Sequence, residues 1–219
     1  MKKLILVAVA AIATLGANAQ SKVKASTWSI QPKAGVTITS ITGLDDANVV
    51  SSYIGSKKES QVNVGATIGG EVEYQATDRF SVAAGVGYIM QGKQWDDFNV
   101  GPVEVRDFKL EMGYVNVPVV ANYYIFKGLA VKAGVQFAFL TNAKLKATEK
   151  EGGRESKESL DIKDQCNTFD FSIPVGVSYE FDNHIVIDAR YNIGITDALK
   201  GGSNHNSVFL ATVGYKFRL

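Results

Sequence analysis

Residues 169–197 read FDFSIPVGVSYEFDNHIVIDARYNIGITD, and apolar and polar side chains alternate along nearly the whole stretch. The apolar positions of its first half are Phe169, Phe171, Ile173, Val175, Val177, Tyr179 and Phe181. After the short Asp182-Asn183 connection, the alternation resumes at Ile185 and continues to Ile195. A period of two is that of a β-strand with one apolar face. The stretch therefore predicts a β-hairpin made of two long strands.

The same period of two occurs in six further segments of the 219-residue chain. They are residues 28–38, 62–74, 80–90, 108–125, 129–139 and 209–219. Segment 108–125 changes parity between Tyr114 and Val115, and we interpret this change as a β-bulge, because one extra residue turns the following side chains over. The pattern predicts an all-β protein with eight strands, and no helical period follows the first twenty residues.

The connections between these strands alternate in length. The short ones are residues 75–79, 126–128 and 182–183, and the long ones are residues 43–60, 91–107, 142–167 and 196–206. Short turns on one rim and long loops on the other are typical of outer-membrane barrels, which an even number of strands closes without a free edge. We therefore expect an eight-stranded antiparallel up-and-down transmembrane β-barrel with short periplasmic turns and long extracellular loops.

Alternation alone does not say which face points outward, because a soluble lipocalin-type barrel alternates with its apolar face inward. Glycine favours the membrane protein, because it makes room in a narrow lumen but weakens a solvated strand. Ten of the 21 glycines lie on the polar face: Gly35, Gly65, Gly69, Gly85, Gly87, Gly113, Gly134, Gly176, Gly194 and Gly214.

Aromatic residues also favour the membrane protein, because they mark the apolar strand ends nearest the short turns, as in a membrane-interface girdle. These residues are Trp28, Tyr74, Phe80, Tyr123, Tyr179, Phe181, Tyr215 and Phe217. The opposite interface is expected to hold Tyr88, Phe108, Phe139, Phe169, Tyr191 and Phe209.

The first twenty residues have the organisation of a signal peptide. Lys2 and Lys3 precede an apolar run over residues 4–15, which at about 12 residues is shorter than the roughly 20 that cross a bilayer. Small residues then lead to a cleavage site between Ala19 and Gln20. We divide the chain into a signal peptide (1–19) and a barrel domain (20–219), exported to the cell outer membrane.

Four segments carry a family resemblance. They are YVNVPVVANYYIF (residues 114–126), FDFSIPVGVSYEF (169–181), IDARYNIGITD (187–197) and the final GYKFRL (214–219). Together they resemble the PorT-type outer-membrane β-barrel family common in Bacteroidota. Members of that family often carry an acidic residue where Asn116 stands here, so this element departs from the pattern. The resemblance implies a barrel fold and an outer membrane location, and it carries no catalytic residue to this chain.

The polar face carries six acidic and six basic residues: Lys33, Glu71, Glu73, Lys109, Glu111, Lys132, Asp170, Glu180, Asp188, Arg190, Lys216 and Arg218. Charges in so narrow a lumen are close enough to pair, and an unpaired one would cost several kcal/mol. We interpret the set as a network of salt bridges that fills the barrel. A selective pore lined by these charges is the alternative.

Catalytic and metal-binding signals are sparse. His184 lies at a short turn and His205 in a long loop, so the two histidines fall on opposite rims. His205 is near Asp197 and two serines (Ser203 and Ser207) in the sequence, which gives a membrane-embedded hydrolase as one alternative. Asp45-Asp46 and Asp96-Asp97 give a weak calcium site or carboxylate cluster as another. We expect neither, and assign no catalytic residue, metal or cofactor.

Composition excludes other classes. The apolar fraction of 46% is too high for a disordered chain, and 23 basic against 22 acidic residues give no field for nucleic acid. The single cysteine, Cys166, excludes a disulfide framework and a cysteine-based zinc site.

Two function classes follow. The first is a structural, surface-interaction or envelope-assembly barrel, whose partners are outer membrane lipids, the barrel-assembly machinery and an envelope or extracellular protein bound through the long loops. The second is a small porin-like transport channel. Residues 142–167 carry six bases and six acids and are expected to form a solvated loop or a partner-binding ribbon.

N-terminal sequencing tests the signal peptide. Protein isolated from envelope fractions should begin at Gln20, because the small residues before it suit signal peptidase. Envelope protein that still begins at Met1 would contradict the assignment.

Overall fold

A computed structural model describes residues 24–43, 60–100, 103–151, 154–201 and 203–219. The expected signal peptide, its cleavage site at Ala19 and Gln20, and Asp45-Asp46 lie outside the described residues. The expectations for those positions therefore stay predictions.

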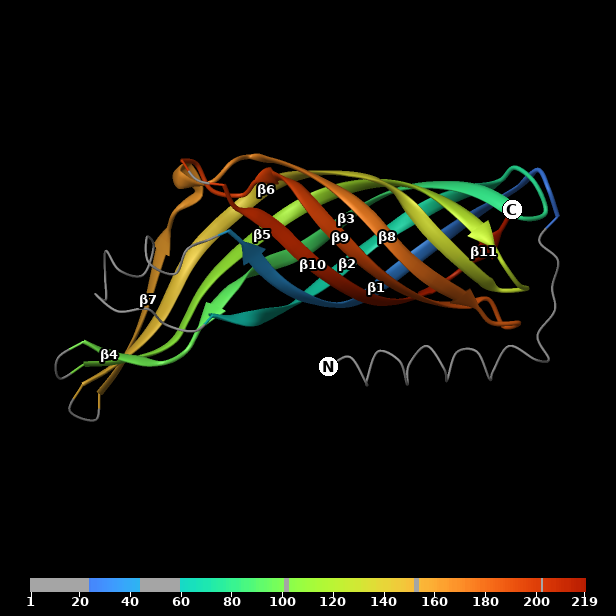
Figure 1. The fold of residues 1–219 in the computed structure, drawn as a ribbon. Coiled ribbons are helices and arrows are strands. Elements are labelled where there is room, and N and C mark those ends of the chain that lie inside the picture. Colours follow the sequence, from blue (N-terminus) through green and yellow to red (C-terminus); the bar gives the residue numbers. More distant parts are fainter. Residues whose placement is uncertain (1–23, 44–59, 101–102, 152–153, 202) are drawn as a thin grey trace.

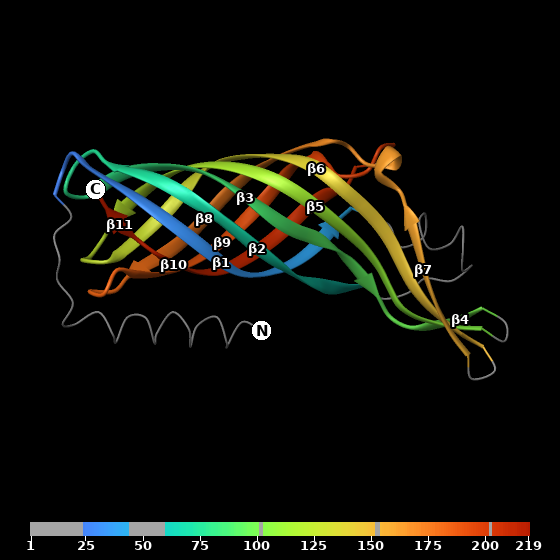
Figure 2. The same ribbon diagram turned by 180° about the vertical axis from the view of Figure 1, so that it is seen from behind.

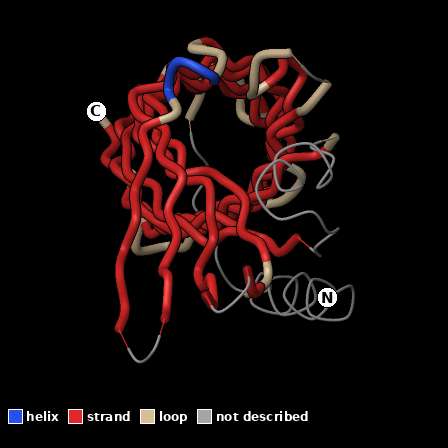
Figure 3. Tube along the Cα trace, turned by 90° about the vertical axis from the view of Figure 1, so that its left-hand side faces the viewer, coloured by secondary structure: helices blue, strands red, loops and turns tan. Residues whose placement is uncertain are grey.

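Within the described residues, eight long strands form a closed antiparallel ring (Figure 1; Figure 3). They are β1 (Thr27–Thr42), β2 (Ser60–Gln75), β3 (Phe80–Trp95), β5 (Val103–Tyr124), β6 (Leu129–Glu151), β8 (Phe169–Glu180), β9 (Ile185–Asp197) and β10 (His205–Tyr215). Each strand pairs with its neighbours in chain order, and β1 pairs with β10 to close the ring. The predicted up-and-down barrel is confirmed.

The two ends of the barrel differ, as the loop lengths predict. Short turns at residues 76–79, 125–128 and 181–184 lie at one end, where the last short strand, β11 (Phe217–Arg218), pairs with β1. The turn at 125–128 depends on Gly128, whose φ of 81° would strain an L side chain. The strand ends that the long connections join lie at the other end (Figure 2).

The burial of side chains shows which face points outward. Large apolar side chains on the outer face are open, with Val64 68% and Ile68 65% exposed. The charged side chains on the opposite face of the strands, such as Glu71, Asp188 and Arg190, are buried. An apolar exterior around a polar interior is the arrangement of a barrel surrounded by lipid.

The bulge predicted between Tyr114 and Val115 is wrong. The parity change in segment 108–125 has a different cause. β5 pairs with β3 in one register from Lys109 to Asn116. The side chains of Phe108, Leu110, Met112 and Tyr114 therefore point inward and are almost fully buried. A register shift occurs beside Gly113, but the extra residue is Thr141 on β6. The pattern changes because the lumen becomes apolar toward the long-loop end.

This correction changes four assignments. Phe108 belongs to the interior and not to the outer aromatic girdle. Gly113, Lys109 and Glu111 share the outward face of β5, because they alternate with the inward residues.

At the long-loop end, two strands continue past the ring. β5 and β6 have 22 and 23 residues, and they pair with β4 (Phe98–Val100) and β7 (Arg154–Asp161). The order β4-β5-β6-β7 makes a four-stranded sheet that projects from the barrel (Figure 1). Much of residues 142–167, expected as a loop, is thus a β-hairpin, followed by the short helix η1 (Lys163–Gln165). No helix among the described residues is long and apolar enough to cross a membrane.

Cysteine labelling tests the orientation. Ser156→Cys on β7 should react with a membrane-impermeant maleimide in intact cells, because residue 156 is exposed on the projecting sheet. Lys127→Cys, in a short turn, should react only after the cells are broken. The wild type is the background control, because its Cys166 is buried. Labelling of residue 127 in intact cells would mean an inverted barrel.

Candidate functional site

The interior of the barrel is the candidate site, and it is divided along the axis into charged and apolar parts. We call the middle group the central cluster: Lys33, Glu71, Lys132, Asp188 and Arg190. The group nearest the short turns is the basal cluster: Glu73, Glu180, Lys216 and Arg218. Toward the long loops lies the apolar layer: Ile89, Trp95, Phe98, Phe108, Leu110, Met112, Tyr114 and Leu140.

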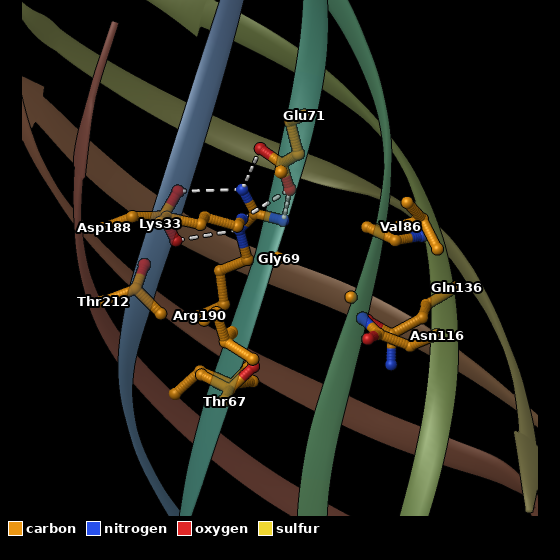
Figure 4. A pocket seen from close by; sticks show the side chains of 15 residues that line it. Lys33, Thr67, Gly69, Glu71, Val86, Asn116, Gln136, Asp188, Arg190 and Thr212 are labelled. Carbon is orange, nitrogen blue, oxygen red and sulfur yellow. Dashed lines mark hydrogen bonds and ion pairs between the residues drawn. The ribbon is translucent and has the colours of Figure 1, made fainter.

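Arg190 on β9 organises the central cluster (Figure 4). Its Nη1 and Nη2 donate to Oε1 and Oε2 of Glu71 on β2 at 2.7 and 2.8 Å. Its Nε and Nη2 also donate to the two carboxylate oxygens of Asp188, at 2.8 and 2.9 Å. The planar guanidinium thus binds two carboxylates at once, a geometry that lysine cannot provide.

Two lysines complete the central cluster. Lys33 Nζ on β1 donates to Glu71 Oε1 at 2.5 Å, and Lys132 Nζ on β6 donates to Asp188 Oδ2 at 2.5 Å. The five side chains therefore form one connected unit contributed by four strands. It forms because every second residue of each strand points into the lumen.

The basal cluster is a second, separate set of ion pairs. Lys216 Nζ lies 2.8 Å from Glu73 Oε2 and 3.3 Å from Glu180 Oε2. Arg218 donates to Glu180 Oε1, and the hydroxyl of Tyr124 donates to Glu73 Oε1 at 2.6 Å. Two acids and two bases balance in this cluster.

The apolar layer lies in the other half of the lumen. The centroid of the Phe108 ring lies 5.2 Å from that of the Trp95 ring and 5.7 Å from that of the Phe98 ring. The Phe108 and Phe98 rings pack edge to face. Buried Lys93 places its ammonium 5.7 Å from the Trp95 ring. Cys166 also packs here, and burial raises the pKa of its thiol to about 11. Such a thiol is protonated and unreactive at neutral pH.

Sequence reasoning missed this apolar layer. Its signal was present as the change of parity in segment 108–125, which we assigned to a bulge. The layer also includes Ile89 and Leu140, which stand among the polar positions of β3 and β6.

The structure brings nine of the twelve predicted lumen charges into the two clusters. Asp170 lies apart from them and accepts a hydrogen bond from Asn206 Nδ2 at 2.8 Å. The prediction that Lys109 and Glu111 face the lumen is wrong, because both lie on the outer face. There, Glu111 contacts the ammonium groups of Lys109 at 2.9 Å and Lys146 at 2.5 Å. They were misplaced because the assumed bulge inverted the face of that part of β5.

The aromatic residues predicted at the short-turn interface lie on the outer face of the barrel. Trp28, Tyr123 and Phe217 are open, at 51%, 48% and 52% exposure. Phe80 and Tyr215 are exposed, and Tyr74 and Phe181 are half-buried. Tyr179 is only 4% exposed, because its ring packs 4.8 Å from Phe181 and against the Gly128 turn.

A cavity of about 30 Å³ adjoins the central cluster. Its lining includes Lys33, Asn116, Arg190 and Thr212 (Figure 4). A buried water needs about 10–15 Å³ of such space, so the cavity accommodates a water or a small ion.

The residues considered for catalysis do not form a complete site. His205 Nδ1 lies 3.2 Å from the Thr196 carbonyl oxygen and 3.7 Å from Asp197 Oδ1. The Ser207 hydroxyl bonds the Tyr191 hydroxyl at 2.5 Å, and His184 lies at the opposite end beside Glu180. In the described part of the chain, no group of three or more His, Cys, Asp or Glu side chains is arranged to hold a metal ion.

Residues 18–200 match the family described as "Outer membrane protein beta-barrel domain". The chain belongs to this family. It is an integral outer membrane β-barrel, located in the outer membrane, with short periplasmic turns and long extracellular loops. Among curated proteins, none matches the chain.

Solved structures of outer membrane proteins are similar to this chain at low identity. OprG from Pseudomonas aeruginosa is 14% identical, with a TM-score of 0.46 over 90% of this chain and 99% of that one. Ail from Yersinia pestis is 14% identical, with a TM-score of 0.42 over 89% and 100%. The protease OmpT from Escherichia coli is 11% identical, with a TM-score of 0.33 over 92% and 99%.

The central cluster predicts a strong effect of Asp188→Asn. The change leaves Lys132 and Arg190 facing a neutral side chain, so the free energy of unfolding should fall by about 3 kcal/mol or more. Urea unfolding of the refolded barrel in micelles measures the loss.

Glu155→Gln on β7 is the matched control, because it also neutralises one acid but at an exposed position. It should leave the unfolding midpoint unchanged. Equal effects of the two substitutions would show that the central cluster contributes no stability.

Proposed function

We propose that this outer membrane barrel is closed and serves a structural, surface-interaction or envelope-assembly role through its extracellular sheet. The extracellular sheet is the projecting sheet of β4, β7 and the outer parts of β5 and β6. The observation that carries the proposal is the succession of side-chain layers along the lumen.

Each layer opposes passage in its own way. The central and basal clusters fill the periplasmic half with paired side chains, and eight strands enclose a space only just wide enough for them. Above them, Ile89, Trp95, Leu110, Met112 and Tyr114 are at most 2% exposed. An apolar constriction excludes hydrated ions because it does not replace their water shell.

The extracellular sheet supports the interaction role. β7 is an edge strand, and residues 155–160 on it are exposed. An edge offers backbone donors and acceptors that can pair with an extended segment of another protein. Its mixed charges, Glu155, Lys157 and Glu158, oppose indiscriminate aggregation while leaving polar contacts for a partner.

The proposal also includes the export of the chain and its place among PorT-type barrels. Residues 1–19 serve as the signal peptide, and the barrel-assembly machinery inserts the mature chain among outer membrane lipids. Segments 114–126, 169–181 and 187–197 support a place among PorT-type barrels. We infer that the chain has no enzymatic role.

A small porin-like channel is the second candidate. It is favoured by the cavity beside the central cluster and by polar lumen side chains such as Asn192, whose amide atoms have no hydrogen-bond partner in the described part of the chain. A channel would require the apolar layer to move aside.

Planar-bilayer recording separates the two candidates. The purified barrel should show no steady ion-selective conductance, because the apolar layer and both clusters obstruct the lumen. A known open porin reconstituted in the same way is the positive control. Large, stable currents from this barrel would establish the channel.

Removal of the β6–β7 hairpin tests the interaction role. Replacing residues 147–158 by a two-residue Asn-Gly turn joins positions that already pair, Lys146 and Ser159, and should leave the ring folded. Surface crosslinking of intact cells should then lose a crosslinked protein that the wild type shows. Identical crosslinking patterns would contradict a role for this hairpin.

A further inference from the structure

The central cluster carries an excess of positive charge. Its cations are Lys33, Lys132 and Arg190, and its anions are Glu71 and Asp188. Three positive groups therefore face two negative ones, and one positive charge is left over. Glu71, Asp188 and Arg190 are at most 5% exposed, so water does not screen this charge effectively.

No neighbouring group of the described lumen balances the excess. The basal cluster is already neutral, with Glu73 and Glu180 against Lys216 and Arg218. Asp170 stands six residues along β8 from Gly176, which pairs with Arg190. At about 3.3 Å per residue this is a separation of roughly 20 Å along the strand.

The cavity adjoins these cations and a buried hydroxyl. Lys33, Arg190 and Thr212 all line it. Thr212 is 4% exposed, and its Oγ1 makes no hydrogen bond in the described part of the chain. The Arg190 guanidinium has five N–H donors, of which four meet Glu71 and Asp188. One N–H of Nη1 remains.

The other lining groups do not oppose an anion strongly. The carboxylates of Glu71 and Asp188 line the cavity, but each is bonded to two cationic side chains. Asn116 adds an amide oxygen without a partner in the described residues, an acceptor whose partial negative charge is smaller than the excess positive charge of the cluster. Gly69 and Gly87 add no side chain to the lining, and a Cβ at residue 69 would clash with the Gly87 Cα at 2.7 Å.

We propose that this cavity binds one small monovalent anion of the halide class, as the counterion of the central cluster, with Lys33, Arg190 and Thr212 as its donors. At about 30 Å³ the cavity suits a chloride or bromide ion and excludes a sulfate or an organic carboxylate. The anion enters as the ring closes and makes the cluster neutral. The site is independent of the role proposed for the extracellular sheet.

Refolding in different salts tests the site. The mature barrel is refolded from urea into micelles in sodium chloride, sodium bromide or sodium gluconate at equal ionic strength. The urea midpoint of unfolding should be higher in both halides than in gluconate, because gluconate is too large for the cavity. Crystals grown in bromide should show an anomalous peak among Lys33 Nζ, Arg190 Nη1 and Thr212 Oγ1.

Three variants make the test specific. Lys33→Met leaves two cations and two anions, and Glu71 keeps both bonds from Arg190, so the halide dependence should disappear. Thr212→Val keeps all charges and should reduce the dependence, which preserves the test if Lys33→Met does not fold. Lys157→Met removes a lysine at an exposed site and should retain the full dependence.

Equal midpoints in the three salts, with no bromide peak in the cavity, would overturn the proposal and leave Lys33 neutral or the cavity filled by water. A halide effect that persists unchanged in both Lys33→Met and Thr212→Val would also overturn it, because the effect would then arise elsewhere on the protein.

Discussion

The contact of Arg190 with Glu71 and Asp188 constrains the rest of this barrel. It joins β9 to β2 across the lumen, between residues 119 positions apart in the chain. A one-residue slip of β9 would turn Arg190 and Asp188 toward lipid. An arginine near the bilayer midplane costs about 2–4 kcal/mol, so the charges hold this strand to one register. Lys33 and Lys132 extend the same constraint to β1 and β6.

The lumen changes character along the axis, and this change connects the fold to the proposed role. The periplasmic half is built from ion pairs, whereas the extracellular half is built from aromatic and aliphatic side chains around Phe108 and Trp95. On the outer face the apolar belt gives way to charged residues such as Lys109 and Glu111. Beyond that level β5 and β6 pair with each other outside the ring, and they continue as part of the extracellular sheet.

The candidate site and the candidate function therefore lie in different parts of the molecule. The charged clusters join strands across the lumen through ion pairs. The extracellular sheet has the exposed edge and the mixed charge that a protein contact uses. The excess positive charge beside the cavity gives the periplasmic half of the barrel a proposed anion site, which is separate from the extracellular sheet.

The sequence by itself determined the strands, their order and the membrane environment, because alternation, turn length and aromatic placement are local properties of the chain. It also determined that Arg190, Asp188 and Glu71 share the polar face. Only the tertiary structure decided which charges meet, because the partners of Arg190 come from another strand and depend on the stagger of the ring. It also decided that Phe108 to Tyr114 point inward while Lys109 and Glu111 point outward. Our interpretation of the sequence pattern took the whole lumen to be polar. Whether a lumen position is polar or apolar depends on its depth along the barrel, and only the closed ring defines that depth.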